Sequence, residues 1–340
     1  MLTPRLEDYI QQGKDFQILL SQIQDKTVSQ SYLFTGNRGL GKRTFARLAG
    51  KALLCTGDGK RPCGTCPSCV MAESRNHPDL IIIEQGKPIA ADVKKDRATI
   101  PVDDIREMIR LCSVQTTDGN LRIVLIYDAD KMTVQAQNCL LKTLEEPPEQ
   151  TCIILVTEHM EAILSTIISR CRIIRFKPWK EEFILQILAK EGTPAEQAHD
   201  IARVCNGSIG KALDLAGNNE YWELRDEVVK AFFRNTKYSE ILKYSNQWKD
   251  RKGEAEQIFQ ILEFHVREML DIRLQGRNDQ GIEQFPAHWQ RFIRGGDIRK
   301  MLALLDAIAD ARKQIKFSTN FQAVAEKLLF LFTGEGNAWL

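Results

Sequence analysis

The sequence predicts an α/β protein: a parallel five-stranded sheet with helices on both sides, followed by a part made of helices alone. Three observations support this fold class. Short apolar runs alternate with helical patterns up to about residue 177, as in sheets whose parallel strands are joined by helices. The first run leads directly into a glycine-rich loop. Beyond residue 178 the apolar spacing is helical throughout.

Composition indicates an ordinary globular protein of 340 residues, 43% hydrophobic and 27% charged, which allows two or three domains at about 100 to 200 residues each. No apolar run is long enough to span a membrane, and Arg5, Glu7 and Asp8 interrupt any signal segment at the start. We therefore expect a cytoplasmic protein without a membrane partner. The net charge of +2 neither favours nor excludes nucleic acid.

The predicted strands are almost uniformly apolar, as is typical of strands covered on both faces. They span residues 32–35, 79–84, 123–128, 151–157 and 173–176. Helices are expected between them from the 3.6-residue spacing of apolar side chains. They include residues 16–23, 45–53, 101–112, 133–146 and 161–168.

The glycine-rich loop has the spacing of a phosphate-binding loop. Gly36 is followed by four residues, then Gly41 and Lys42, with Gly39 between. The glycines let backbone N–H groups approach phosphate oxygens, and Lys42 would reach the outer phosphates of ATP, the candidate ligand. The alternative is a plain glycine-rich turn between a strand and a helix.

The metal-binding half of this motif is incomplete. Arg43 stands where a Ser or Thr would hold Mg²⁺, and the nearest hydroxyl, Thr44, comes one residue late. Asp128 ends a strand and would hold Mg²⁺ in a phosphate-loop enzyme, or alternatively acts as a strand-end cap. Ala129 occupies the position where many ATPases have a water-orienting Glu, and we expect Asp130 to point elsewhere.

Four of the nine cysteines, Cys55, Cys63, Cys66 and Cys69, form a compact set in Gly- and Pro-containing sequence. Such spacing predicts a structural Zn²⁺ site with four thiolate ligands and no open position. Disulfides are the alternative, which a reducing compartment disfavours. We interpret His77 as a turn residue rather than a fifth ligand.

From Pro178 onward only helices are expected. Residues 181–190, 194–205 and 208–216 predict a three-helix unit, and 217–219 read as a linker. Aromatic residues recur in the helical patterns beyond it, with Lys and Arg nearby. A nucleic-acid surface is one interpretation of these aromatic residues, but a helix-bundle core is favoured. The later helices are expected at residues 221–233, 254–274, 297–317 and 321–332.

The order of these motifs resembles the AAA+ subunits of the bacterial DNA polymerase III clamp loader. Besides the loop, the Cys set and Asp128-Ala129, the resemblance includes the stretch 140–148 (LLKTLEEPP) and Ser169-Arg170-Cys171. It implies an AAA+ nucleotide-binding-like domain at 1–177 with a zinc module at 55–69. A three-helix lid at 178–217 and a helical collar at 218–340 would follow.

Three departures separate the chain from the ATP-hydrolysing motor subunits (gamma/tau) of that family. The motor has Asp-Glu at the strand end, a Ser or Thr after the loop lysine, and an Arg in the third lid helix. Here those positions hold Ala129, Arg43 and Gly210. The resemblance therefore implies a subunit without ATPase activity of its own, with a motor subunit as the alternative. Thr157 matches the family's strand-four sensing position.

The same resemblance implies the partners and the role of Arg170. The collar would join the delta subunit and three motor subunits in a component of the DNA polymerase III holoenzyme, which opens the sliding clamp and places it on primed DNA. Arg170 would point into the ATP site of a neighbouring motor subunit. The alternative for Arg170 is a surface arginine before a strand. A stand-alone zinc DNA-binding module is disfavoured, since residues 55–69 carry few basic side chains.

Overall fold

The computed structural model describes residues 4–87, 89, 98–116, 121–234, 237–274, 282–283, 285–295, 297–317 and 320–333. The chain divides into two compact units, Met1–Ala216 and Gly217–Leu340. Each unit has its own buried core, and each is described separately below.

The first unit contains a five-stranded sheet with the order β2-β3-β4-β1-β5. All neighbouring strands are parallel. In chain order the strands are β1 (Ser31–Thr35), β2 (Leu80–Ile83), β3 (Arg122–Ile126), β4 (Thr151–Thr157) and β5 (Arg172–Arg175). Thr35 and Thr157 are paired at the carboxyl ends of the neighbouring interior strands β1 and β4. Ligands of parallel α/β sheets bind at this edge.

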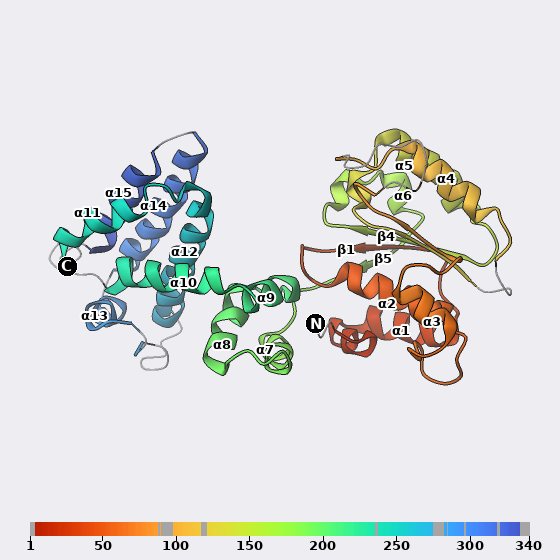
Figure 1. The fold of residues 1–340 in the computed structure, drawn as a ribbon, viewed down its shortest axis with the longest axis horizontal. Helices are drawn as coiled ribbons and strands as arrows, with labels where there is room; N and C mark the ends of the chain where they lie inside the picture. Colours follow the sequence, from red (N-terminus) through yellow and green to blue (C-terminus); the bar gives the residue numbers. More distant parts are fainter. Residues whose placement is uncertain are drawn as a thin grey trace. The chain divides into compact units, whose positions relative to one another are not determined.

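Helices cover both faces of the sheet, as Figure 1 shows. One face carries α1 (Lys14–Asp25), α2 (Lys42–Leu54) and α3 (Pro67–Glu73); the other carries α4 (Val102–Cys112), α5 (Val134–Glu145) and α6 (Ser165–Ile168). Both cores are apolar, in keeping with strands buried on two sides. The α/β fold class and the strands predicted from the sequence are confirmed.

The helix predicted at 161–168 is confirmed only in its second half, and its first half is wrong. The structure has a short 3-10 helix at Met160–Ala162 and then α6, separated by extended backbone at Ile163 and Leu164. The Leu164 N–H donates instead to Oε1 of Gln137, 2.8 Å away. This side-chain partner replaces a helical one, so the helical spacing of the sequence is interrupted.

Three helices follow the sheet within the first unit, close to where they were expected. They are α7 (Glu181–Lys190), α8 (Ala195–Val204) and α9 (Ile209–Ala216). The N-terminal 3-10 helix η1 (Leu6–Gln12) packs with α1 and α2 and buries Tyr9.

The second unit is helical in its described part. Its elements are α10 (Asn219–Val229), the π-helix η5 (Lys230–Arg234), α11 (Tyr238–Gln247), the 3-10 helix η6 (Lys252–Glu254), α12 (Ala255–Leu274), α13 (Ala287–Gly295), α14 (Ile298–Lys316) and α15 (Phe321–Thr333). Phe232, Phe233, Trp248 and Trp289 are buried, and Phe232 stacks on Trp248 with 5.3 Å between ring centroids. The core interpretation holds for these aromatic residues. The sequence reading missed α11 and α13.

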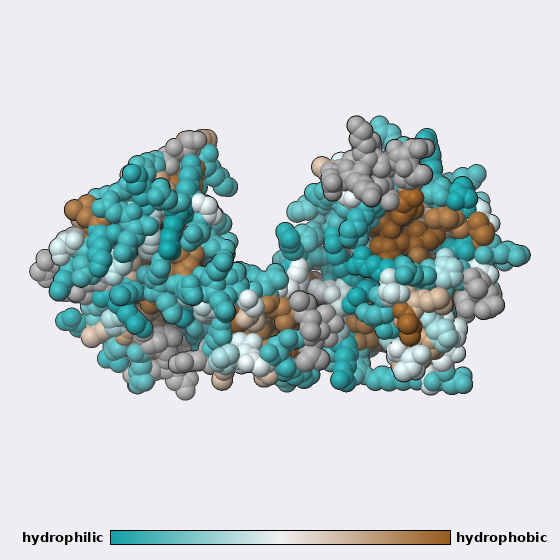
Figure 2. Space-filling view, in the orientation of Figure 1, coloured by the Kyte–Doolittle hydropathy of each residue, from teal (hydrophilic) through white to brown (hydrophobic). Residues whose placement is uncertain are grey.

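Among the described residues, no helix is both long and apolar enough to cross a bilayer. Figure 2 shows mainly hydrophilic residues on the visible face of the second unit, and on the first unit hydrophilic residues around an apolar patch, drawn in brown.

Candidate functional site

The glycine-rich loop adopts backbone conformations that require its glycines. Gly36, Gly39 and Gly41 have φ values of +142°, +77° and +88°, which side chains strongly disfavour. A Cβ on Gly36 would lie 2.7 Å from the Phe176 carbonyl oxygen. The loop is also held from outside: Tyr9 donates its hydroxyl hydrogen to Gly41 O at 2.9 Å.

Lys42 begins α2 and lies inside the loop, with only 5% of its surface exposed. Its Nζ donates to Gly36 O at 2.6 Å and Asn37 O at 2.7 Å. Desolvation lowers the pKa of this ammonium below its ordinary value. The loop's own carbonyls therefore hold a buried cation where outer phosphates would approach.

The two positions associated with magnesium are joined to each other. Arg43 donates from its terminal nitrogen to Asp128 Oδ2 and forms an ion pair with it. The guanidinium also lies 5.4 Å from the centre of the Tyr127 ring. Asp128 makes no side-chain cap hydrogen bond with the short helix after it, so the cap interpretation of Asp128 is wrong.

Asp130 does not point away from the site, contrary to expectation, but lines the same cavity as Asp128. Its Oδ1 accepts hydrogen bonds from Thr157 Oγ1 at 2.9 Å and from the Glu158 N–H at 3.4 Å. Lys131 lies 3.5 Å from its other oxygen. Asp130 is thus occupied by protein groups, and it ties the end of β4 to the segment after β3.

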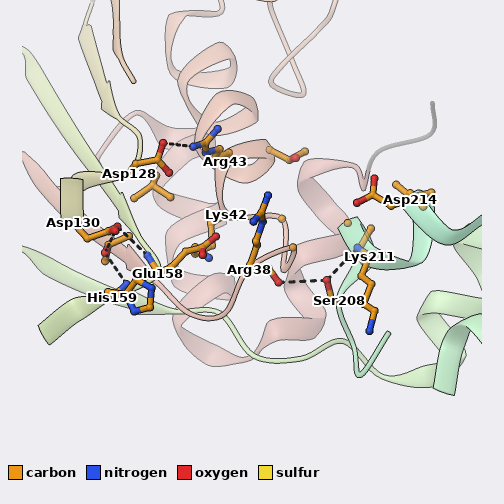
Figure 3. A pocket seen from close by; sticks show the side chains of 18 of the residues that line it. Arg38, Lys42, Arg43, Asp128, Asp130, Glu158, His159, Ser208, Lys211 and Asp214 are labelled. Atoms are coloured by element: carbon orange, nitrogen blue, oxygen red, sulfur yellow. Dashed lines mark hydrogen bonds and ion pairs between the residues drawn. The ribbon is translucent and has the colours of Figure 1, made fainter. Parts of the chain in front are cut away.

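These groups surround a cavity of about 910 Å³ at the carboxyl edge of the sheet. Figure 3 shows Arg38 and Lys42 near its middle, the Arg43–Asp128 pair on one side, and residues of α9 on another. Thr44 also lines it. The lining further includes Gly39, Gly41, Asp130, Glu158, His159, Ser208, Gly210, Lys211 and Asp214.

The beginning of α9 is docked directly on the loop. The Gly210 N–H donates to Gly39 O at 2.9 Å, and Ser208 Oγ donates to Arg38 O at 3.3 Å. A Cβ on Gly210 would come within 3.0 Å of Gly39 Cα. The close approach therefore depends on the absence of a side chain at Gly210.

The four predicted cysteines converge. Their sulfur atoms lie within 4.8 Å of one another, with Cys55–Cys66 at 3.9 Å and Cys63–Cys69 at 4.0 Å. A tetrahedral zinc ion with bonds of about 2.3 Å would place its sulfurs about 3.8 Å apart. The donor set therefore fits a single metal ion. His77 instead accepts the Asp79 N–H at 3.1 Å, as expected for a turn residue.

Local backbone geometry favours thiolates in this set. The backbone N–H groups of Cys63, Cys66 and Cys69 each point at the sulfur of the preceding ligand, at 3.4 Å. Desolvation opposes ionisation of Cys66, but the N–H of Cys69 and further hydrogen bonds lower the pKa of Cys66 to about 5. Desolvation raises the pKa of Cys69 to about 12. A bound cation would offset that cost, because metal binding deprotonates coordinating thiols.

Arg170 lies outside this cavity, just before β5. Its guanidinium donates to Thr166 O at 2.9 Å and forms an ion pair with Glu145, at the end of α5. Its side chain remains 34% exposed. Cys171, the next residue, is half-buried, and desolvation raises the pKa of its thiol to about 12. The arginine is therefore held at the surface beside an unreactive thiol.

Gln137 is a site-supporting residue that the sequence reading missed. Its buried amide donates to Met132 O at 3.3 Å and Ala162 O at 3.1 Å, while its oxygen accepts the Leu164 N–H. These bonds attach α5 to the segment that leads to Arg170. The one sequence signal for this role is that Gln137 is a polar residue on an otherwise apolar face of the helix.

The glycine-rich loop, the strand-end carboxylate and the cysteine set belong to a parallel α/β fold whose four clustered cysteines could hold a metal ion. The family model described as "DNA polymerase III, delta subunit" matches residues 11–180. The chain belongs to this family, and with it to the clamp-loader proteins of DNA polymerase III.

The similarity to individual relatives agrees with this family membership. The DNA polymerase III subunit delta' of Bacillus subtilis is 29% identical over 94% of this chain and 95% of its own length. Its Escherichia coli counterpart is 31% identical over 64% of this chain and 63% of its own. The subunit tau/gamma of Haemophilus influenzae is 34% identical, over 61% of this chain but 30% of its own length.

Proposed function

We propose that this protein is a delta'-type subunit of the replicative clamp loader that does not hydrolyse ATP. In this role it supplies Arg170 to the ATP site of a neighbouring gamma/tau motor subunit. The assembly, which also includes the delta subunit, opens the sliding clamp and loads it onto primed DNA. The observation that carries the proposal is the Arg43–Asp128 ion pair beside Ala129.

The absence of hydrolysis follows from the chemistry of these positions. A phosphate-loop ATPase needs Mg²⁺ between the phosphates and the strand-end Asp, and a polar group that orients the attacking water. Asp128 is engaged by Arg43, and Ala129 offers a fully buried methyl group. Asp130 is held by Thr157. Gly36, Gly39, Gly41, Lys42 and Thr44 would remain as a phosphate cradle.

Arg170 has the properties of an arginine supplied in trans. A guanidinium that reaches a partner's phosphates must be exposed and supported by its own chain. The side chain of Arg170 is partly exposed, and its terminal nitrogens bond to Thr166 O and the Glu145 carboxylate of the same chain. Arg170 lies just before β5 and is not among the residues that line the chain's own cavity.

The remaining parts would serve assembly. We assign residues 1–177 to an AAA+ domain with a structural Zn²⁺ at Cys55, Cys63, Cys66 and Cys69. Residues 178–217 would form the lid, and residues 218–340 a collar that joins delta and the motor subunits. Such a replication protein would work in the cytoplasm.

The alternative is an ATP-hydrolysing motor of the gamma/tau type. Lys42 and Asp128 favour this alternative, as does the similarity to tau/gamma of H. influenzae. The two functions differ in whether the isolated chain hydrolyses ATP.

The trans role predicts a specific defect in the reconstituted clamp loader carrying Arg170→Ala. Loss of an arginine finger slows hydrolysis at its site by about 10³ to 10⁵. Rapid-quench measurement with clamp and primed DNA should therefore show one ATP fewer hydrolysed per complex in the first turnover. Arg175→Ala, on the exposed end of β5, is the matched control. An unchanged burst in the Arg170 variant, with the complex intact by gel filtration, refutes the trans role.

A further inference from the structure

We propose that the loop binds the polyphosphate chain of a nucleotide without a divalent metal, with the Arg43 guanidinium in place of the ion. This inference rests on the proposed function in one respect, since it concerns the same non-hydrolysing site. It adds the form of the ligand, which is a metal-free nucleoside di- or triphosphate.

The metal position is closed by a permanent cation. Mg²⁺ in a phosphate loop is held by the hydroxyl after the lysine and by the strand-end Asp. Arg43 provides no oxygen, and its guanidinium occupies Asp128. The Tyr127 ring, 5.4 Å from the guanidinium carbon, provides a second attraction that keeps the cation at this place.

Neighbouring residues do not replace the missing ligands. Thr44 lies one residue further along α2, which turns its side chain by about 100° from that of Arg43. Asp130 already accepts hydrogen bonds from Thr157 and the Glu158 N–H. Mg²⁺ requires near-octahedral oxygen geometry and gives up water reluctantly. Within the described residues, the site therefore lacks an ordered set of oxygens for it.

The groups that hold phosphates are nevertheless retained. Lys42 is buried within the loop, Arg38 lies beside it in Figure 3, and the first-turn amides of α2 face the same space. The cavity of about 910 Å³ falls within the range of about 300 to 1,000 Å³ that small-molecule sites occupy. Glu158 and Asp214 also line it, so the cations must outweigh their repulsion, and we expect modest affinity.

The test is a titration of the full-length chain with a fluorescent ATP or ADP analogue, once in excess Mg²⁺ and once in excess EDTA. The dissociation constants of wild-type protein in excess Mg²⁺ and in excess EDTA should agree within about threefold, which is a difference in binding free energy of less than about 1 kcal/mol. Arg43→Ser should weaken binding in EDTA and make it Mg²⁺-dependent, because Asp128 is released and a hydroxyl is supplied. The expected gain from Mg²⁺ in this variant is about tenfold or more.

Arg47→Ser is the matched control, because it removes a guanidinium one turn further along α2 that pairs with Glu73 rather than lining the cavity. It should bind as the wild type does. The proposal is overturned if wild-type protein binds nucleotide only with Mg²⁺, or binds none in either condition. Neither result affects the first-turnover burst that tests Arg170, so the two proposals fail separately.

Discussion

Arg43 changes the chemistry of two positions at once, because it removes a hydroxyl and engages a carboxylate. The pair it forms joins residues 85 positions apart in the chain. A partly exposed ion pair of this kind stabilises a fold by only about 0 to 1 kcal/mol. Its importance therefore lies in occupying the ligands of a metal rather than in stability.

Gln137 has the opposite role, since its side chain is buried and its three hydrogen bonds are structural. Gln137→Leu should lower the free energy of unfolding of the first unit by about 1–3 kcal/mol, because it removes the hydrogen bonds that the buried Gln137 amide makes with Met132, Ala162 and Leu164. Chemical denaturation followed by circular dichroism measures this loss. Gln135→Leu on the exposed side of α5 is the control. Equal stability of the two variants would contradict the supporting role.

At the scale of single residues and short motifs, the sequence predicted those features whose residues lie close together in the chain. The loop glycines, Lys42 and the cysteine spacing lie within short stretches, so their geometry follows from the chain itself. Contacts such as Arg43 to Asp128 could not be predicted, because the hydrophobic period of a helix does not specify which distant side chain meets it. The prediction of the orientation of Asp130 was wrong for the same reason, because its hydrogen-bond partner Thr157 lies at the end of another strand.

At the level of elements, the segment between α2 and α3 depends most on its cysteines. Few apolar side chains lie between Cys55 and Cys66, and Gly57 approaches Cys63 so closely that a Cβ would lie 2.8 Å from its sulfur. A structural metal can contribute about 10–16 kcal/mol in small peptides. Ion binding is therefore able to fold a segment that lacks a core.

Cys66→Ser should abolish metal retention and leave the sheet folded. Mass spectrometry under native conditions should find one zinc per wild-type chain and none in the variant. Cys139→Ser removes a thiol outside the cluster and should retain the ion. A metal-free preparation with wild-type protection of residues 55–69 against proteolysis would contradict a structural role for the ion.

Element boundaries followed the sequence where apolar periodicity was strong and failed where polar contacts intervened. The strands and α7 to α9 lie close to their expected positions. The break before α6 depends on Gln137. The π-helix Lys230–Arg234 after α10 shifts the helical phase around Phe232 and Phe233.

At the level of the whole molecule, the proposed function and its alternative differ in autonomous ATP turnover. The isolated chain should show no steady-state hydrolysis above background, because water-orienting and metal-binding groups are missing or engaged. The measurement is phosphate release with and without clamp and primed DNA. Turnover that these partners stimulate and that Lys42→Ala abolishes would support the motor and refute our proposal.

The bond between Gly39 and Gly210 links the loop to α9 through main-chain atoms alone. The loop around Gly39 and the start of α9, 171 positions apart in sequence, are therefore expected to move together. Any ligand that reshapes the loop around Gly39 must either tilt α9 with it or break that bond. A change in the loop can thus be transmitted to the three-helix segment through the contact between these two glycines.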